Sequence, residues 1–127
     1  MPATVVAQSA STVAFLDHRP IFPGHTLVVP REHVVTLRDL APDQVGPYFR
    51  DVQRVAVAVQ DGLDAQGTFV AENNVVSQSV PHLHVHVVPR RRKDGLRGFF
   101  WPRSKYASDA EAAEVASRLG AALAAPR

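Results

Sequence analysis

The feature that most constrains this chain of 127 residues is an alternating run of histidines and aliphatic residues, His82-Leu83-His84-Val85-His86-Val87-Val88. Successive side chains of a β-strand point to opposite faces, so a strand here would direct all three imidazoles to one face. The β-branched valines, with Pro81 before the run and Pro89 after it, favour a strand over a helix. The run therefore predicts a strand over residues 82–88 with three titratable rings on one side.

Three imidazoles on one face allow several uses. Imidazole titrates near neutrality, and rings about 6.6 to 7 Å apart along a strand can act together on one phosphate or one metal ion. A zinc site of His82, His84, His86 and His25 is the weaker reading, because alternate rings on a nearly flat strand are too widely spaced to bring three nitrogens to ~2.0 to 2.1 Å from one ion. A third possibility is that the three histidines form a solvated polar face of the strand and have no functional role. We expect no metal at this site.

Composition narrows the class of protein. The length fits a single domain over residues 1–127, and 46% hydrophobic residues suffice for a core. The absence of Cys excludes disulfides, thiolate catalysis and Cys-based zinc sites. No segment approaches the roughly 20 apolar residues of a membrane span, and no signal-like segment opens the chain, so we expect a cytoplasmic protein without membrane contact.

Charge gives little support for nucleic-acid binding. The net charge is only +2, and much of the excess lies in one run, Arg90-Arg91-Arg92-Lys93. Such a local run does not make a nucleic-acid-binding surface, so we expect no nucleic-acid partner. These four residues either lie in a solvated loop or produce a positive field that attracts an anionic substrate. The sequence leaves both possibilities open.

Hydrophobic periodicity predicts the remaining elements. Over 42–60 apolar residues recur three or four apart, which indicates a helix that ends at Asp61-Gly62. Its start is either at Asp43 as N-cap or, because Gly46 and Pro47 follow, nearer Pro47. Ser108 and Glu111 form a capping box before a C-terminal helix. Further strands are expected at 12–17, 25–30 and 67–72, and this order of elements predicts an α+β domain with an antiparallel sheet.

The run His82–Val88 resembles the signature of the histidine triad (HIT) family of nucleotide hydrolases and transferases. Residues 23–33 resemble the family's first conserved segment, residues 14–17 resemble the strand before it, and residues 78–81 occupy the place before the triad. The resemblance implies a single HIT-like domain of about five antiparallel strands, a main helix and a C-terminal helix. Its core is expected at about 12–92, followed by a C-terminal aromatic loop and helix over 93–127.

The resemblance implies hydrolysis at the α-phosphorus of a purine nucleoside phosphoramidate or a dinucleoside polyphosphate. The middle histidine of the triad, His84, would attack phosphorus, and water would release a nucleoside monophosphate from the nucleotidyl-histidine. His86 would contact the phosphate or the departing group, while His82 and His25 would orient the other rings. No cofactor is required by this chemistry. A nucleotide-binding interaction module with little turnover is the alternative, because binding and slow chemistry use the same residues.

The resemblance also assigns binding residues. It places Gln78 and Ser79 on the phosphate, and Asp17, Asn74 and Phe15 around the nucleoside, with the Asn74 alignment uncertain by one residue. Where many members have a Gly-rich loop, this chain has residues 73–77 without glycine. A homodimer is implied as well, and the aromatic run 99–101 is expected to cover the body of the protein or a partner subunit.

Overall fold

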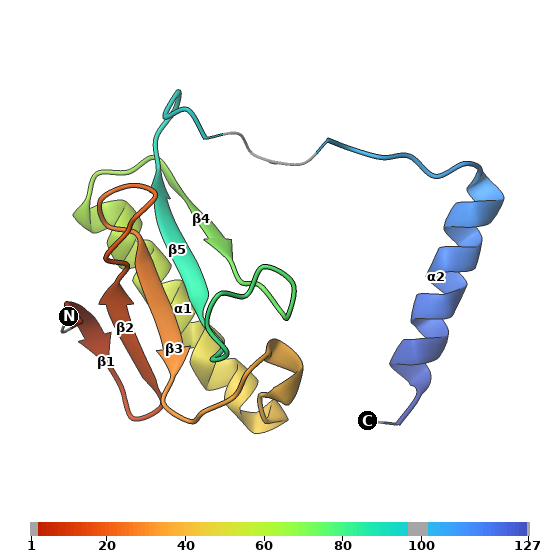
Figure 1. The fold of residues 1–127 in the computed structure, drawn as a ribbon, viewed down its shortest axis with the longest axis horizontal. Helices are drawn as coiled ribbons and strands as arrows, with labels where there is room; N and C mark the ends of the chain where they lie inside the picture. The colour runs from red at the N-terminus through yellow and green to blue at the C-terminus, as the bar shows by residue number, and fades with distance from the viewer. Residues whose placement is uncertain (1–2, 97–101, 127) are drawn as a thin grey trace. The chain divides into compact units, whose positions relative to one another are not determined.

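The computed structural model describes residues 3–96 and 102–126 and divides into two compact units, Met1–Asp94 and Gly95–Arg127. The first unit is built on a five-stranded antiparallel sheet with strand order β1-β2-β3-β5-β4 (Figure 1). The predicted α+β fold with about five strands is confirmed. The strands are β1 (Val5–Gln8), β2 (Thr12–Leu16), β3 (Thr26–Pro30), β4 (Gly67–Ala71) and β5 (Val85–Arg90).

Helix α1 (Pro42–Gly62) lies against one face of this sheet, behind the strands in the view of Figure 1. Its buried residues Val52, Val55 and Val59 recur three and four apart and join Val85 and Val87 of β5 in one core cluster. Burial of each such side chain contributes about 1.5 to 3 kcal/mol. The helix and its end at residue 62 agree with the prediction.

The N-cap prediction for this helix is wrong. Ala41 is the N-cap, and Pro42 takes the first helical position, where a missing N–H costs nothing. Asp43 lies in the first turn instead, where its negative charge interacts favourably with the positive end of the helix dipole. The helix continues through Pro47.

Two elements were not predicted. β1 is exposed along its whole length, so it carries no alternation of buried and exposed residues that a pattern could reveal. A single 3₁₀ turn, η1 (Leu37–Asp39), precedes α1. The Asp39 carboxylate accepts hydrogen bonds from the Thr36 backbone N–H at 3.0 Å and from its hydroxyl at 2.7 Å, which fixes the start of this turn.

The strand predicted over 82–88 begins at Val85 and ends at Arg90, so His82 and His84 precede the ladder. Val28 of β3 pairs with Val85, and before this point the Leu83 N–H donates outside the sheet, to the Val34 carbonyl at 2.8 Å. The strand also runs through Pro89, which was expected to end it. Pro89 is tolerated because β3 begins at Thr26, opposite Val87, and leaves no partner on that side for an N–H of residue 89.

The second unit contains α2 (Asp109–Ala124). The Ser108 hydroxyl accepts the Glu111 N–H at 3.1 Å, so Ser108 is the N-cap as predicted. The capping box is not complete, because the Glu111 carboxylate accepts the Ala107 N–H at 3.1 Å and not that of Ser108. The aromatic residues Phe99, Phe100 and Trp101 lie outside the described residues, and the single domain over 1–127 stays a prediction. Within the described ranges, no helix combines the length and apolarity needed to cross a membrane.

Candidate active site

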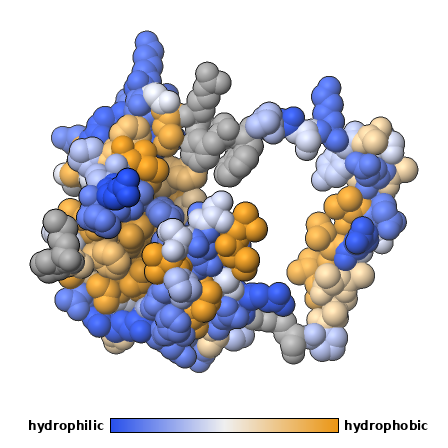
Figure 2. All heavy atoms as spheres, viewed as in Figure 1, coloured by the Kyte–Doolittle hydropathy of each residue, from blue (hydrophilic) through white to orange (hydrophobic). Residues whose placement is uncertain are grey.

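A cavity of about 460 Å³ opens on the sheet face that α1 leaves uncovered. This volume is typical of small-molecule sites. One part of its wall is apolar and the other carries the histidines, and Figure 2 shows hydrophobic and hydrophilic residues side by side over the unit that contains this face. The lining residues are Phe15, Asp17, His18, Leu27, Val29, Ser79, Val80, His82, His84 and His86.

His84 presents a nitrogen lone pair to this cavity. Its Nδ1 lies 2.8 Å from the carbonyl oxygen of His82, and since a carbonyl can only accept, Nδ1 must carry the proton. The Nε2 of the neutral ring is then unprotonated, which is the state that a nucleophilic imidazole requires. The side chain is nearly buried, at 8% exposed, so its orientation is restrained by packing as well.

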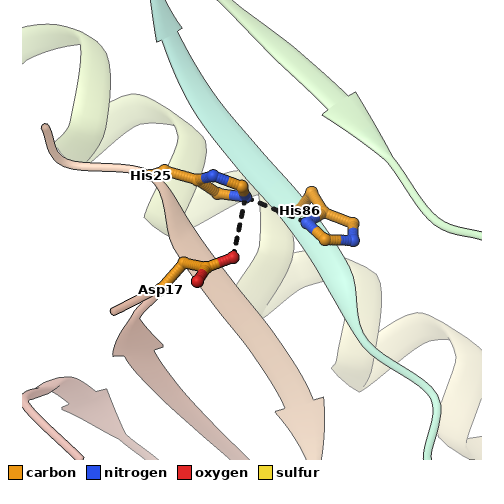
Figure 3. A group of neighbouring side chains, drawn as sticks. All are labelled: Asp17, His25 and His86. Atoms are coloured by element: carbon orange, nitrogen blue, oxygen red, sulfur yellow. Dashed lines mark hydrogen bonds and ion pairs between the residues drawn. The ribbon is translucent and has the colours of Figure 1, made fainter. Parts of the chain in front are cut away.

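His25 and His86 are joined in a directed hydrogen-bond chain (Figure 3). The Ile21 backbone N–H donates to His25 Nδ1 at 3.1 Å, so the proton of a neutral His25 sits on Nε2. That Nε2 lies 2.9 Å from His86 Nδ1 and donates to it. The proton of a neutral His86 is therefore on Nε2, and His86 enters the cavity as a hydrogen-bond donor.

Burial keeps these two rings neutral at neutral pH. Desolvation lowers the pKa of His25 below its ordinary value, although the Asp17 carboxylate, 3.7 Å from His25 Nε2, acts in the opposite direction. Burial is also the largest cause that lowers the pKa of His86, and the neighbouring rings His84 and His25 lower it further. The hydrogen-bond directions derived for neutral rings therefore apply at pH 7.

Comparison with known proteins identifies the family of this chain. The HIT domain model matches residues 1–93. The chain belongs to the HIT domain family. The bis(5'-nucleosyl)-tetraphosphatase [asymmetrical] of Schizosaccharomyces pombe is 35% identical over 65% of this chain, which spans only 47% of that relative. The adenosine 5'-monophosphoramidase hnt1 of the same organism is 28% identical over 80% of this chain and 75% of its own length.

Solved HIT structures share the fold. A HIT family protein from Bacillus subtilis superposes with a TM-score of 0.88 at 28% identity, covering 99% of this chain and 92% of its own. A Zn-bound histidine triad family protein from Mycobacterium smegmatis gives a TM-score of 0.71 at 35% identity, covering 95% of this chain and 89% of its own.

One group of side chains in this HIT domain has the composition of a metal site. Ligand atoms of Asp17, His25 and His86 all lie within 4.8 Å of one another. A metal on His25 Nε2 would need the lone pair there and would move the proton to Nδ1, where it would face the Ile21 N–H. The Ile21 amide therefore opposes metal binding by this group and favours its use as a hydrogen-bond chain.

The sequence analysis missed two histidines at the site, His18 and His33, and the apolar lining residues Leu27, Val29 and Val80. His18 is exposed and lines the cavity next to Asp17. His33 lies outside the cavity lining, but its Nδ1 is 3.1 Å from Nδ1 of His82. His33 ends the segment 23–33 that carries the family resemblance, so its place was visible in the sequence while its contact with the triad was not.

Asn74 and Gln78 hold the β4–β5 connection in place. The Asn74 side chain accepts the Leu37 N–H at 2.8 Å and donates to Glu72 at 2.7 Å. The Gln78 side chain accepts the Val75 N–H at 3.0 Å and donates to the carbonyl of Val35. Both side chains thus tie this connection to the segment between β3 and α1. Their roles toward the nucleoside and the phosphate stay predictions, as does the phosphate-binding role of Ser79, which lines the cavity.

The same connection adopts left-handed backbone conformations without glycine. Val75 has φ of 69° and Ser77 has φ of 63°. A β-branched residue in this region is a strained outlier, and the Gln78 side chain secures it by accepting the Val75 N–H. The loop therefore reaches, at a cost in strain, conformations that glycine adopts freely.

Proposed function

We propose that this protein hydrolyses a purine nucleotide at the α-phosphorus, in a nucleoside phosphoramidate or a dinucleoside polyphosphate, through a nucleotidyl-histidine on His84. The observation that carries this proposal is the 2.8 Å contact between His84 Nδ1 and the His82 carbonyl, which leaves Nε2 free to attack. The names of the two Schizosaccharomyces pombe relatives, a tetraphosphatase and a monophosphoramidase, support the same chemistry.

The reaction proceeds in two displacements. In the first, His84 Nε2 forms a bond to phosphorus while the bond to the departing nitrogen or oxygen breaks, and the leaving group takes up a proton from solvent. In the second, water attacks phosphorus, the bond to His84 breaks, and the proton is returned to solvent. The products are a nucleoside monophosphate and the free leaving group, and the neutral ring of His84 is restored.

The surrounding groups stabilise charge on the phosphoryl oxygens. His86 Nε2–H is directed into the cavity by the chain from Ile21 through His25, and the Ser79 hydroxyl lines the same space. Donors fixed before the substrate binds are commonly worth several kcal/mol in the transition state. We propose that these donors act without a metal or another cofactor.

The cavity wall suits a nucleoside. Phe15, Leu27 and Val29 form an apolar surface on which a purine can pack, and Asp17 lies on the same wall with a carboxylate able to accept ribose hydroxyls. Asp17 also accepts the Arg19 N–H at 2.9 Å, which holds the carboxylate in a turn. The positions of Phe15 and Asp17 support their predicted roles toward the nucleoside.

The charges at the cavity favour a phosphoramidate over a tetraphosphate. None of its lining residues is Lys or Arg, in the part of the chain that the structure describes. Arg90 is committed elsewhere, since its guanidinium pairs with Asp94 at 2.6 and 3.1 Å. A dinucleoside tetraphosphate carries several negative charges beyond the α-phosphate and would find few cations here. We therefore propose that the better substrate is one whose leaving group carries no further phosphates.

We also propose a cytoplasmic homodimer. β4 is an edge strand whose outer side has no partner strand in the described sheet, and its Val70 is 44% exposed. On α1, Val45, Phe49 and Val57 are exposed as well. Sedimentation equilibrium at micromolar concentration tests the dimer, and a monomer at all concentrations removes it.

A substrate panel tests the proposed activity. Wild-type protein and His84→Ala are compared on adenosine and guanosine phosphoramidates, diadenosine polyphosphates and adenylyl sulfate. We expect turnover by wild type, fastest on a phosphoramidate, and loss of at least 10³-fold in His84→Ala, as for removal of other nucleophiles. Equal rates in the two proteins would exclude His84 as the nucleophile. Tight binding of a nucleoside monophosphate without turnover of any substrate would instead favour a binding module.

A further inference from the structure

His33 contacts the triad from the solvent side. It is exposed, lies three residues after the end of β3, and forms a T-shaped ring contact with His82, with centroids 5.0 Å apart and planes at 70°. The two Nδ1 atoms are 3.1 Å apart, within hydrogen-bond distance. One of the two rings must therefore donate to the other.

The direction of this bond follows from the other nitrogen of His82. His82 Nε2 lies 2.9 Å from the Pro30 carbonyl oxygen, which can only accept, so Nε2 carries the proton. The Nδ1 of a neutral His82 then has a lone pair, and the proton in the shared bond belongs to His33 Nδ1. Both ring nitrogens of His82 are thus engaged, and the ring is fixed between Pro30 and His33.

The backbone of His82 needs such support. The β5 ladder starts only at Val85, and the His82 N–H bonds locally to the Val80 carbonyl at 2.8 Å. The peptide that follows His82 is held by one backbone bond, from the Leu83 N–H to the Val34 carbonyl at 2.8 Å. His33 and Val34 are adjacent, so one short segment holds both the ring and the following peptide of His82.

That peptide supplies the carbonyl that selects the tautomer of His84. We propose that His33 is a positioning residue: by holding the His82 ring, it keeps the His82 carbonyl on His84 Nδ1 and leaves His84 Nε2 as the free nucleophile. The consequence for catalysis rests on the function proposed above, but the effect on the tautomer does not. His33 itself does not line the cavity and acts only through His82.

Three variants isolate this effect. His33→Ala removes the donor, His33→Asn returns a side-chain N–H near the position of Nδ1, and Glu32→Ala changes the exposed neighbouring residue as a control. Urea unfolding of each variant verifies that the fold is intact. The ring nitrogens of His84 are then assigned by ¹⁵N NMR at pH 8 without nucleotide, and kcat and KM are measured on a phosphoramidate.

We expect a single Nδ1–H tautomer of His84 in wild type, Glu32→Ala and His33→Asn, and a mixture of both tautomers in His33→Ala. kcat should fall about two- to tenfold in His33→Ala, the range for one lost hydrogen bond, with KM unchanged. An unchanged tautomer in His33→Ala, or no recovery in a folded His33→Asn, overturns the proposal. If the tautomer shifts as expected while wild type turns over no substrate, the proposed function fails and the positioning role stands.

Discussion

His25 Nε2 lies 2.9 Å from His86 Nδ1, and the Ile21 amide on the far side of His25 determines which of the two rings donates. A backbone N–H cannot lose or redirect its proton, so it imposes one tautomer on His25 and, through it, one on His86. The direction of this chain explains how a group of three potential metal ligands can serve as a source of hydrogen bonds.

His25, which is buried, and His86, which is half-buried, should make stability depend on pH. Burial lowers the pKa of His25 and His86 in the folded state, so below about pH 6.5, the ordinary value for His, the unfolded chain binds more protons. The contribution of the two neutral rings to the free energy of unfolding is complete above about pH 6.5. It is lost as the pH falls through the lowered pKa values of the folded state. Urea unfolding between pH 5 and 8 measures this dependence. A double variant, His25→Gln with His86→Gln, should lose free energy of unfolding less steeply on acidification, and equal slopes would contradict the assignment.

Metal removal should leave activity unchanged. Because the Ile21 amide opposes a lone pair on His25 Nε2, the site needs no ion for its hydrogen bonds. Dialysis against a chelator, followed by a phosphoramidate assay with and without added zinc, checks this prediction. A loss of activity that zinc restores would show that a metal does take part.

The same argument predicts a variant with a gain of metal affinity. Ile21→Pro lacks the amide proton, so His25 Nδ1 can carry its own proton and Nε2 becomes available to a metal. Titration calorimetry should show up to about tenfold tighter zinc binding than in Ile21→Ala, which keeps the amide; tenfold corresponds to about one hydrogen bond. Equal affinities of these two variants would mean that the amide does not control the site.

Burial of one face explains why helix α1 was predicted and strand β1 was missed. Val52, Val55 and Val59 face the core and leave a helical period, whereas β1 is exposed and leaves no period. Alternation also placed the three triad rings together, although the ladder begins only at Val85. Periodicity reports which face a side chain occupies, and it says nothing about where the backbone hydrogen bonds of a strand begin.

The tautomers could not be predicted from residue types. They are set by the Ile21 N–H and by the carbonyls of Pro30 and His82, and every residue type offers such a carbonyl. The role of Gln78 was obscured for a related reason. Its amide can bind a phosphate or hold a loop equally well, and only the positions of Val35 and Val75 reveal the second use. Function at this level depends on backbone placement across segments distant in sequence.

A cation at the cavity should change the preferred leaving group. Val80 lines the cavity and is 54% exposed, so Val80→Lys can place an ammonium beside the site without burying it. An exposed ion pair is worth about 0.2 to 1 kcal/mol, so kcat/KM for diadenosine tetraphosphate should rise up to about fivefold relative to a phosphoramidate. Val80→Met is the uncharged control of similar length. The gain should shrink as salt is added, and a gain independent of salt would exclude an electrostatic origin.

Gly24 should be irreplaceable in the loop that carries His25. Its φ is 102°, and a Cβ at this position would lie 2.2 Å from Leu63 Cδ1 and 3.6 Å from Pro89 Cγ. Gly24→Ala therefore adds backbone strain of roughly 1 to 3 kcal/mol, whereas the overlap is with the end of the Leu63 side chain, which is 41% exposed and can move away. Gly67→Ala is the matched control, because a Cβ there meets no atom within 4 Å. Urea unfolding should show a loss of about 1 to 3 kcal/mol in Gly24→Ala and little change in Gly67→Ala. Combining Gly24→Ala with Leu63→Ala should give the sum of the single changes, because the loss comes from the backbone, and a double variant more stable than that sum would show that the overlap contributes as well.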